Sequence, residues 1–246
     1  MSDKDTLYRD ESIQADQFVF DDRVVRVFPD MIRRSVPGYG LVIPSIALLA
    51  REYAQPESNI YDLGCSLGGV SFAIMDAVTD KNCRLTAVDN SAEMIEKISA
   101  FAAKRQGKTA DSVDLQIVEA DVLDVAIEDA SFVVLNFTLQ FIDPSRRLGL
   151  LERICGGMRP GGALVLSEKL CFDDPREQDL HNAWHLNFKR AQGYSELEIA
   201  RKRDALEDTL IPDSMKEHLE RLSQAGFSKA YQWFQCFNFA SIVAIR

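Results

Sequence analysis

Polar side chains follow four predicted strands of this chain, at points where they could meet a ligand. Each comes at or directly after a short apolar run, and they are Asp62, Asp89, Asp121 and Asn136. Ligands of open α/β sheets bind outside the carboxyl ends of the strands. We therefore expect these four side chains to lie along one rim of a sheet and to bind a ligand there.

Asp89 has the most specific position of the four. It lies 25 residues after Gly64, close to the roughly 20-residue spacing at which an acid meets the hydroxyls of a ribose. A carboxylate at this position accepts both hydroxyl protons and repels a ribose phosphate. The alternative is an acid that only complements the dipole of the following helix. Because Asn90 is expected to cap that helix, ribose binding is the favoured interpretation.

The turn after the first predicted strand is rich in glycine. Gly64, Cys65 and Ser66 open it, and the apolar run 70–75 that follows is expected to be helical. Glycine lets the backbone approach a ligand, and a helix N-terminus offers free N–H groups. Ser66 replaces the second glycine of the dinucleotide motif G-x-G-x-x-G, and the absence of Gly-Lys-Ser/Thr excludes a P-loop. A tight turn in an unrelated α/β protein is the alternative.

The other rim residues fit further parts of a nucleoside. Asp121 could accept from an adenine amino group, Val122 could offer a backbone N–H to the ring, and Asn136 could face the reacting centre. Asp62 could hold a ligand amino group or only brace the turn, and the sequence leaves both open. Together the acids suit S-adenosylmethionine, which is cationic and carries no phosphate.

Two features resemble sites and have simpler explanations. His181 and His185 have the i,i+4 spacing of metal ligands on a helix, but no third ligand stands at a useful spacing. An exposed or half-buried helix face is therefore the preferred interpretation, and no metal is expected. Cys65 has no evident histidine partner and is not expected to be a nucleophile. Its expected role is steric and through its backbone N–H.

A basic cluster at 201–203 has two interpretations. One is a solvated helix face with Glu198–Lys202 and Arg203–Glu207 pairs at i,i+4 spacing. The other is an anion clamp on a lid. The residues alone favour the solvated face.

Composition restricts the class of protein. The chain has 246 residues, of which 46% are hydrophobic, and a net charge of −10. That length suits a single domain, and the acidic balance argues against direct binding of nucleic acid, which needs a basic face. The five scattered cysteines indicate reduced thiols in a cytoplasmic protein. Neither a signal peptide nor a membrane span is expected.

Strand and helix patterns alternate through most of the chain. We expect one domain with a helical extension at 1–55, a nucleoside-binding core at 56–170, a helical insertion at 171–212, and a final helix and strand pair at 213–246. This α/β layout is typical of the Rossmann-like, seven-stranded class I methyltransferase fold, with an insertion after strand five. Within it, residues 1 to about 20 are expected to lie across the domain. The segment 159–162 is expected to turn into the fifth strand. Ser214 and Glu217 are expected to open the last helix as a capping box, and the final two strands to pair antiparallel.

Longer motifs make the resemblance specific. The chain resembles the carboxy-S-adenosyl-L-methionine synthase family of the class I methyltransferase superfamily along nearly its whole length, apart from 98–114. The segments that carry the resemblance are 27–32, 35–39, 61–68, 133–141, 161–169, 193–199 and 233–239. Cys65-Ser66, which departs from the general methyltransferase pattern, belongs to the pattern of this family.

The resemblance implies a reaction other than methyl transfer. S-adenosylmethionine and prephenate give carboxy-S-adenosylmethionine, phenylpyruvate and water, as a sulfonium ylide captures the CO2 that prephenate loses. The resemblance also implies that Arg203, with Tyr39 nearby, binds the new carboxylate, which reverses the preference for a solvated face. It further implies a homodimer, and whether Arg203 acts in its own subunit or across the interface stays open. The product is then expected to serve a partner enzyme that carboxymethylates tRNA wobble uridines.

The sequence identifies neither a general base nor the residues that bind prephenate, for which Arg and Lys side chains near the insertion are candidates. The departing group of prephenate could take the methyl proton itself. Two other functions remain possible at this stage. One is an ordinary S-adenosylmethionine-dependent methyltransferase acting on a small molecule or tRNA. The other is a non-catalytic nucleoside-binding partner of a tRNA-modifying enzyme.

Overall fold

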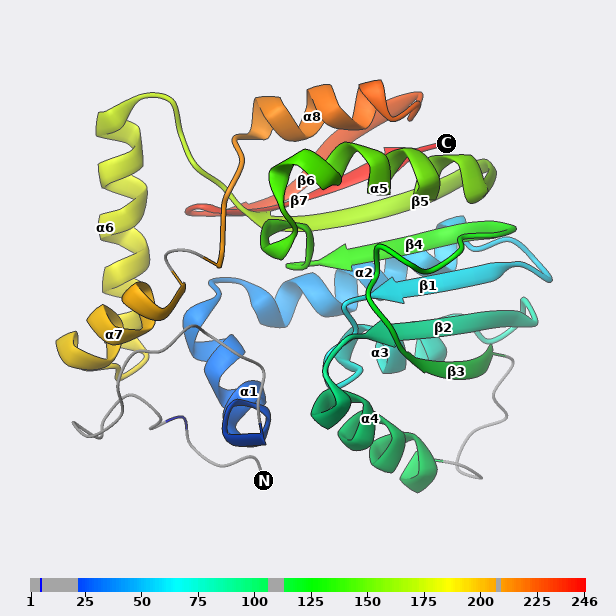
Figure 1. Ribbon diagram of the computed structural model, residues 1–246, viewed down its shortest axis with the longest axis horizontal. Helices are drawn as coiled ribbons and strands as arrows, with labels where there is room; N and C mark the ends of the chain where they lie inside the picture. The colour runs from blue at the N-terminus through cyan, green and yellow to red at the C-terminus, as the bar shows by residue number, and fades with distance from the viewer. Residues whose placement is uncertain (1–4, 6–21, 106–112, 207–208) are drawn as a thin grey trace.

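The computed structural model describes residue 5 and residues 22–105, 113–206 and 209–246 (Figure 1). The segment that was expected to lie across the domain, 1 to about 20, falls almost wholly outside these residues. No helix of the described chain is long and apolar enough to cross a membrane.

Seven strands form one sheet in the order β3-β2-β1-β4-β5-β7-β6. Strands β1 to β5 pair in parallel, and β7 lies antiparallel between β5 and β6. The expected seven-stranded sheet and its antiparallel final pair are therefore confirmed. The strands are β1 (Asn59–Leu63), β2 (Cys83–Asp89), β3 (Val113–Glu119), β4 (Ala130–Asn136), β5 (Met158–Lys169), β6 (Lys229–Cys236) and β7 (Phe239–Ile245).

Helices cover both faces of the sheet. The helices of the described chain are α1 (Asp22–Ser35), α2 (Tyr39–Tyr53), α3 (Gly69–Ala77), α4 (Ala92–Arg105), the 3-10 turn η1 (Leu139–Phe141), α5 (Pro144–Gly157), α6 (Pro175–Ala191), α7 (Glu196–Leu206) and α8 (Met215–Gln224). An apolar core under α5 and α8 includes Leu150 and Leu222, and a second under α2 and α3 includes Ile46 and Ile74. Each such side chain contributes about 1.5–3 kcal/mol when fully buried. This two-sided burial explains the continuous apolar run of β4.

The helices of the extension and the insertion meet at one end of the sheet. Figure 1 shows α1, α6 and α7 beyond the carboxyl ends of the parallel strands, where the chain returns to the sheet through α8. Helix α6 begins at Asp174, whose side chain accepts from the N–H of Arg176, with Pro175 in the first turn. Such an acidic cap and proline are favoured at helix N-termini. This end of the sheet is therefore walled by helices from distant parts of the sequence.

One predicted helix cap is confirmed and another is wrong. Ser214 and Glu217 form the expected capping box of α8. Helix α4 is capped by Ser91, whose Oγ accepts from the backbone N–H of Met94 at 3.2 Å, and not by Asn90. The cap is one residue later than predicted because Asp89 holds the backbone N–H of Ser91 at 3.0 Å.

Strand β5 begins earlier than the sequence indicated. The segment 159–162 was expected to be a turn, but it lies within the strand, which starts at Met158. Gly161 has a φ of 76° and its N–H donates to the carbonyl of Arg246. The register between β4 and β5 shifts here. Glycine therefore produces an irregularity in the strand where a turn was predicted.

Candidate functional site

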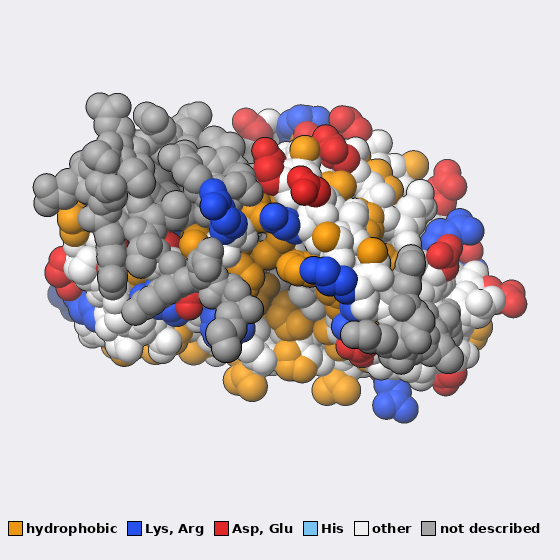
Figure 2. Space-filling model, turned by 90° about the horizontal axis from the view of Figure 1, so that it is seen from below, with side chains coloured by type: hydrophobic (Ala, Val, Ile, Leu, Met, Phe, Trp, Pro, Cys, Tyr) orange, Lys and Arg blue, Asp and Glu red, His pale blue; other side chains and the backbone are white. Residues whose placement is uncertain are grey.

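A deep pocket opens where the carboxyl ends of the strands meet α1, α6 and α7. Its volume is about 1730 Å³. Figure 2 shows this face hollowed at its centre, with apolar side chains inside and Lys and Arg side chains at its margin. All ten predicted binding residues line it: Tyr39, Gly64, Cys65, Ser66, Asp89, Asn90, Asp121, Val122, Asn136 and Arg203. The structure brings them together, and their contacts with a ligand remain a prediction.

Asp89 fastens the glycine-rich turn to the second strand. Its carboxylate accepts from the backbone N–H of Ser66 at 2.8 Å and from that of Ser91 at 3.0 Å. Burial raises the pKa of Asp89, and these N–H donors oppose the rise. A carboxylate has about four lone-pair sites, so further acceptor capacity remains for ligand hydroxyls. Asp89 can therefore hold the turn and a ribose at once.

The glycine-rich turn is held in one backbone conformation. Gly64 has a φ of 83°, and a Cβ there would lie 2.3 Å from Oγ1 of Thr138. The N–H groups of Gly64 and Cys65 both donate to the carbonyl of Val88, at 2.8 and 2.9 Å. The expectation that Cys65 offers its N–H to a ligand is therefore wrong, because the sheet edge already uses that donor. Burial also raises the pKa of the Cys65 thiol, which suits its expected steric role.

Asp62 is a buried acid with no cationic partner among the described residues. Its carboxylate accepts from Oγ of Ser71 at 2.6 Å, which ties β1 to α3. Burial is the largest cause that raises the pKa of Asp62 to about 6. Burial, followed by the charge of Asp62, also raises the pKa of Tyr39 to about 12. Asp62 thus braces the turn and also lies in the pocket wall, so the two roles that the sequence left open are compatible.

Asp121 lies two residues beyond the end of β3, and Asn136 ends β4, on the other side of β2 and β1. Oδ1 of Asp121 accepts from the backbone N–H of Leu123 at 2.8 Å, which shapes the turn containing Val122. Oδ1 of Asn136 is buried and has no hydrogen-bond partner among the described residues. A buried carbonyl without a donor is costly. Because Asn136 lines the pocket, a ligand that donates a hydrogen bond to it would remove that cost.

A group of basic residues that the sequence indicated only in general, as Arg and Lys side chains near the insertion, lies on another wall of the pocket. Lys169 ends β5, Lys189 lies in α6 and Lys202 lies in α7, and all three line the pocket. His185 lies among them and contacts the carbonyl of Ser35 through Nε2 at 2.8 Å. Since a carbonyl only accepts, that nitrogen carries the proton. Burial and the three lysines lower the pKa of His185 to about 3, so the ring is neutral.

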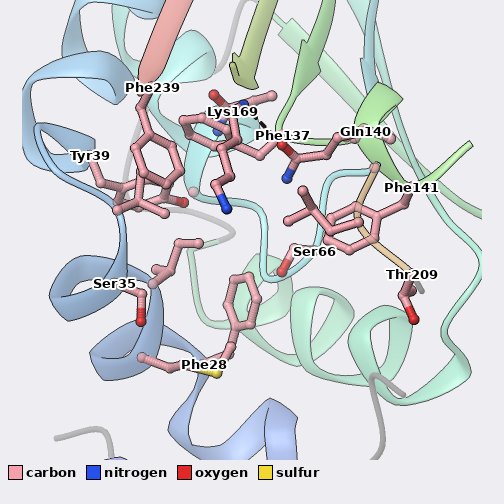
Figure 3. A pocket seen from close by; sticks show the side chains of 18 of the residues that line it. Phe28, Ser35, Tyr39, Ser66, Phe137, Gln140, Phe141, Lys169, Thr209 and Phe239 are labelled. Carbon is pink, nitrogen blue, oxygen red and sulfur yellow. Dashed lines mark hydrogen bonds between the residues drawn. The ribbon is translucent and has the colours of Figure 1, made fainter. Parts of the chain in front are cut away.

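Three aromatic rings connect the two walls. The rings of Tyr39 and Phe137 are 6.3 Å apart, those of Phe137 and Phe239 are 5.9 Å apart, and Phe239 meets the His185 ring at 4.9 Å. Figure 3 shows Tyr39, Phe137 and Phe239 beside one another, with the amino group of Lys169 pointing into the pocket. The pocket therefore has an acidic wall, an aromatic middle and a basic wall.

Comparisons with known proteins identify the family. A family model described as a methyltransferase domain matches residues 60–162. A carboxy-S-adenosyl-L-methionine synthase of Geobacter metallireducens is 54% identical over 242 residues, which cover 98% of each chain. The chain belongs to the carboxy-S-adenosyl-L-methionine synthase family. A protein of the same name from Pseudomonas aeruginosa is 49% identical over 245 residues, 100% of each chain.

Solved structures show the same fold in more distant proteins. Human N-acetylserotonin methyltransferase in complex with SAM matches with a TM-score of 0.58 at 19% identity. The match covers 91% of this chain and 55% of that one. At this identity the likeness shows the class I methyltransferase fold alone. The fold expected from the sequence is thus confirmed, and the synthase family is established by the full-length relatives.

Arg203, the residue through which the family resemblance implied carboxylate binding, lies at the margin of the pocket. Its guanidinium is exposed and lies 3.4 Å from Asp204 of the same helix. The alternative Arg203–Glu207 pair involves a residue outside the described ones. A water-excluded pair between Arg203 and a carboxylate would therefore require further cover over α7.

The solvated-face interpretation is wrong for the residue before Arg203. Lys202 is 5% exposed and does not pair with Glu198. Its Nζ donates to Oγ of Ser35 at 2.8 Å and lies 3.6 Å from a carboxylate oxygen of Asp5. Lys202 turns inward because α7 packs its inner side toward α1, which no local pattern reveals.

The expected exposed or half-buried helix face is confirmed for His181, which is half-buried, and is wrong for His185, which is buried. His185 is buried against Ser35, whereas the His181 ring stacks on Phe172 with centroids 4.0 Å apart. No group of three potential ligands among the described His, Cys, Asp and Glu residues is placed to hold a metal ion.

Proposed function

We propose that this protein converts S-adenosylmethionine and prephenate into carboxy-S-adenosylmethionine, phenylpyruvate and water. The observation that carries the proposal is the division of one pocket into an acidic and a basic wall. A cationic and an anionic substrate need such complementary surfaces, and the full-length relatives carry the name of this synthase.

The acidic wall fits S-adenosylmethionine. Asp89 stands where ribose hydroxyls would bind, and Asp62 is a buried acid without a cationic partner among the described residues. The amino group or the sulfonium of the ligand supplies a positive charge near Asp62. Asn136 accepts a hydrogen bond from that amino group or from a neighbouring donor of the ligand. We assign Asp121 and the backbone N–H of Val122 to the adenine ring. A carboxylate at Asp89 also excludes ligands with a ribose phosphate.

The remaining space fits a second, anionic molecule. Pockets for a single drug-sized ligand occupy roughly 300–1,000 Å³, and this one has about 1730 Å³. Phe137 and Phe239 offer apolar surface to a ring, and the lysines beyond them offer positive charge. An ordinary methyltransferase acting on a neutral acceptor has no need for three lysines in its substrate pocket.

The reaction requires that the pocket walls exclude water and retain CO2. The ring carboxylate of prephenate leaves as CO2, and the ring hydroxyl leaves with the sulfonium methyl proton as water. The methyl carbon, left with an electron pair, bonds to the carbon of CO2. The aromatic middle keeps water from quenching that carbon and keeps CO2 from escaping. The Tyr39 hydroxyl, whose pKa is raised to about 12, stays protonated and can donate to the new carboxylate.

We assign Arg203 the role of binding the negatively charged new carboxylate. The guanidinium is exposed in the single chain, so we propose that a homodimer contact or movement of α7 covers it when product forms. We further propose that the protein works in the cytoplasm and supplies its product to a tRNA wobble-uridine carboxymethyltransferase. The net charge of −10 suits a protein that makes the small molecule and does not itself bind tRNA.

Mass spectrometry tests the reaction directly. Purified protein is incubated with S-adenosylmethionine, with and without prephenate, and the nucleosides are analysed. We expect a species heavier than S-adenosylmethionine by one CO2 only when prephenate is present, with an equal amount of phenylpyruvate. Transfer of a labelled methyl group to an acceptor, without the heavier species, would indicate an ordinary methyltransferase. Binding of the nucleoside without any turnover would indicate a non-catalytic partner protein.

A further inference from the structure

Lys169 and Lys189, here called the lysine pair, are half-buried in the pocket wall and differ in their partners from the buried cations of the described chain. Each Lys or Arg that is fully buried has a carboxylate partner: Arg34 has Asp30, Arg147 has Asp213 and Lys202 has Asp5. No ion pair or side-chain hydrogen bond joins either member of the lysine pair to any described residue.

The electrostatics of the lysine pair show the same deficit. Burial, followed by the charges of Lys202 and Lys169, lowers the pKa of Lys189 to about 7. Burial also lowers the pKa of Lys169. Burying an ammonium group without an anion is costly, and two neighbouring ammonium groups repel each other. Such an arrangement is stabilised by an anion that enters the pocket.

The fold holds the two lysines in place from different elements. The backbone N–H of Lys169 donates to Oε1 of Gln140 at 2.9 Å, which fixes the end of β5 against η1. The neighbouring Glu168 accepts from the backbone N–H groups of Leu139 and Gln140 at 3.0 and 2.9 Å. Lys189 approaches from α6. The backbone that carries Lys169 is thus fixed before an anion binds, which lowers the ordering cost of binding.

We propose that the lysine pair binds the side-chain carboxylate of the 2-oxo acid substrate, the carboxylate that survives in the product. This assignment rests on the proposed function for the identity of the acid. The ring carboxylate has to be lost as CO2, and cations that stabilised it in the ground state would slow its loss. The lysine pair is therefore assigned to the other carboxylate, and the ring lies toward Phe137 and Phe239.

This assignment predicts that phenylpyruvate, which keeps the side-chain carboxylate, binds through the lysine pair. The experiment measures phenylpyruvate binding by titration calorimetry on Lys169→Met, Lys189→Met and wild-type protein, each loaded with S-adenosylmethionine. We expect each substitution to raise the Kd of phenylpyruvate by about ten- to a hundredfold, the loss typical of a charge-assisted hydrogen bond. The KM for prephenate should rise in parallel, and Lys169→Arg should recover part of the loss.

Two controls make the result specific. Lys216→Met removes an exposed lysine of α8, outside the pocket, and should leave phenylpyruvate binding unchanged. The Kd of S-adenosylmethionine should change less than about twofold in the lysine variants, which shows that they are folded.

The outcomes separate this inference from the proposed function. Unchanged phenylpyruvate binding in both methionine variants, or no binding to the wild type, would overturn the inference even if the wild type makes the carboxylated nucleoside. If the wild type makes no such nucleoside but binds phenylpyruvate through the lysine pair, the reaction is wrong and the anion site stands.

Discussion

The carboxylate of Asp89, at the end of β2, accepts a hydrogen bond of 2.8 Å from the backbone N–H of Ser66, in the turn after β1. One acid thus fixes the turn and faces the pocket.

We expect Asp89→Asn to weaken S-adenosylmethionine binding by about ten- to a hundredfold, because a neutral amide is a weaker acceptor and its NH2 opposes the N–H of Ser66. Titration calorimetry measures the change. Asp114→Asn, an exposed change on β3, is the matched control.

Two glycines give opposite predictions for the same substitution. At Gly64, where φ is 83°, an added Cβ would lie 2.3 Å from Oγ1 of Thr138, so Gly64→Ala should destabilise the fold by at least about 1–3 kcal/mol. At Gly149, inside α5, an added Cβ meets nothing within 4 Å, so Gly149→Ala should stabilise it by up to about 1 kcal/mol. Urea denaturation measures both. Equal effects would contradict the backbone argument.

Arg203→Ala should distinguish the two nucleosides. Carboxy-S-adenosylmethionine should lose about ten- to a hundredfold in affinity, because a charged hydrogen bond is removed, whereas S-adenosylmethionine should change less than threefold. Competition binding against one fluorescent nucleoside measures both constants. Arg176→Ala, on the surface of α6, serves as the control. Equal losses for the two ligands would assign Arg203 a structural role only.

The lowered pKa of Lys189 predicts the pH dependence of the second substrate. Lys189 is cationic below its pKa of about 7 and neutral above it, so kcat/KM for prephenate should fall as pH rises above 7, by up to about tenfold per unit. The groups around it are Lys169 on β5, Lys202 on α7 and His185 on its own helix. His185 is already neutral in this range. Burial lowers the pKa of Lys202 to about 8, which steepens the fall.

The control for this profile is Lys189→Met, which should flatten it between pH 6.5 and 7.5. The Kd of S-adenosylmethionine should stay nearly constant over the same interval in both proteins. A wild-type profile that rises from pH 7 to 8 would contradict the assignment, since the loss of positive charge cannot favour an anion.

Removal of a lysine from the pair should stabilise the ligand-free protein. Lys189→Met replaces a half-buried cation that has no ion-pair partner among the described residues with an apolar side chain of similar length. We expect the Tm to rise by about 2–4 °C, the shift that about 1 kcal/mol produces in a chain of this size. Calorimetry without ligand measures it, and Lys216→Met should shift the Tm by no more than about 1 °C. A lower Tm for Lys189→Met would show that the cation is compensated in the folded protein.

The sequence by itself determined the sheet and the acidic wall of the pocket. Runs such as 130–135 report burial on both faces of a strand, and a residue that ends a parallel strand must lie at the same edge as its counterparts. Asp62, Asp89, Asp121 and Asn136 converge for that reason, and all line the pocket. The position of each follows from its own strand, so local pattern was sufficient.

Only the tertiary structure decided the basic wall. Lys202 lies in a charged helix whose sequence reads as solvated, yet its amino group reaches Ser35, 167 residues away. Lys169, Lys189 and His185 meet because α6 and α7 fold back over the end of the sheet. Periodicity tells which residues share a face of a helix but not what that face packs against. The charge environment of a lysine depends on the elements packed around it. The positions of Lys169, Lys189 and Lys202 relative to one another therefore follow from the tertiary structure and not from the sequence pattern.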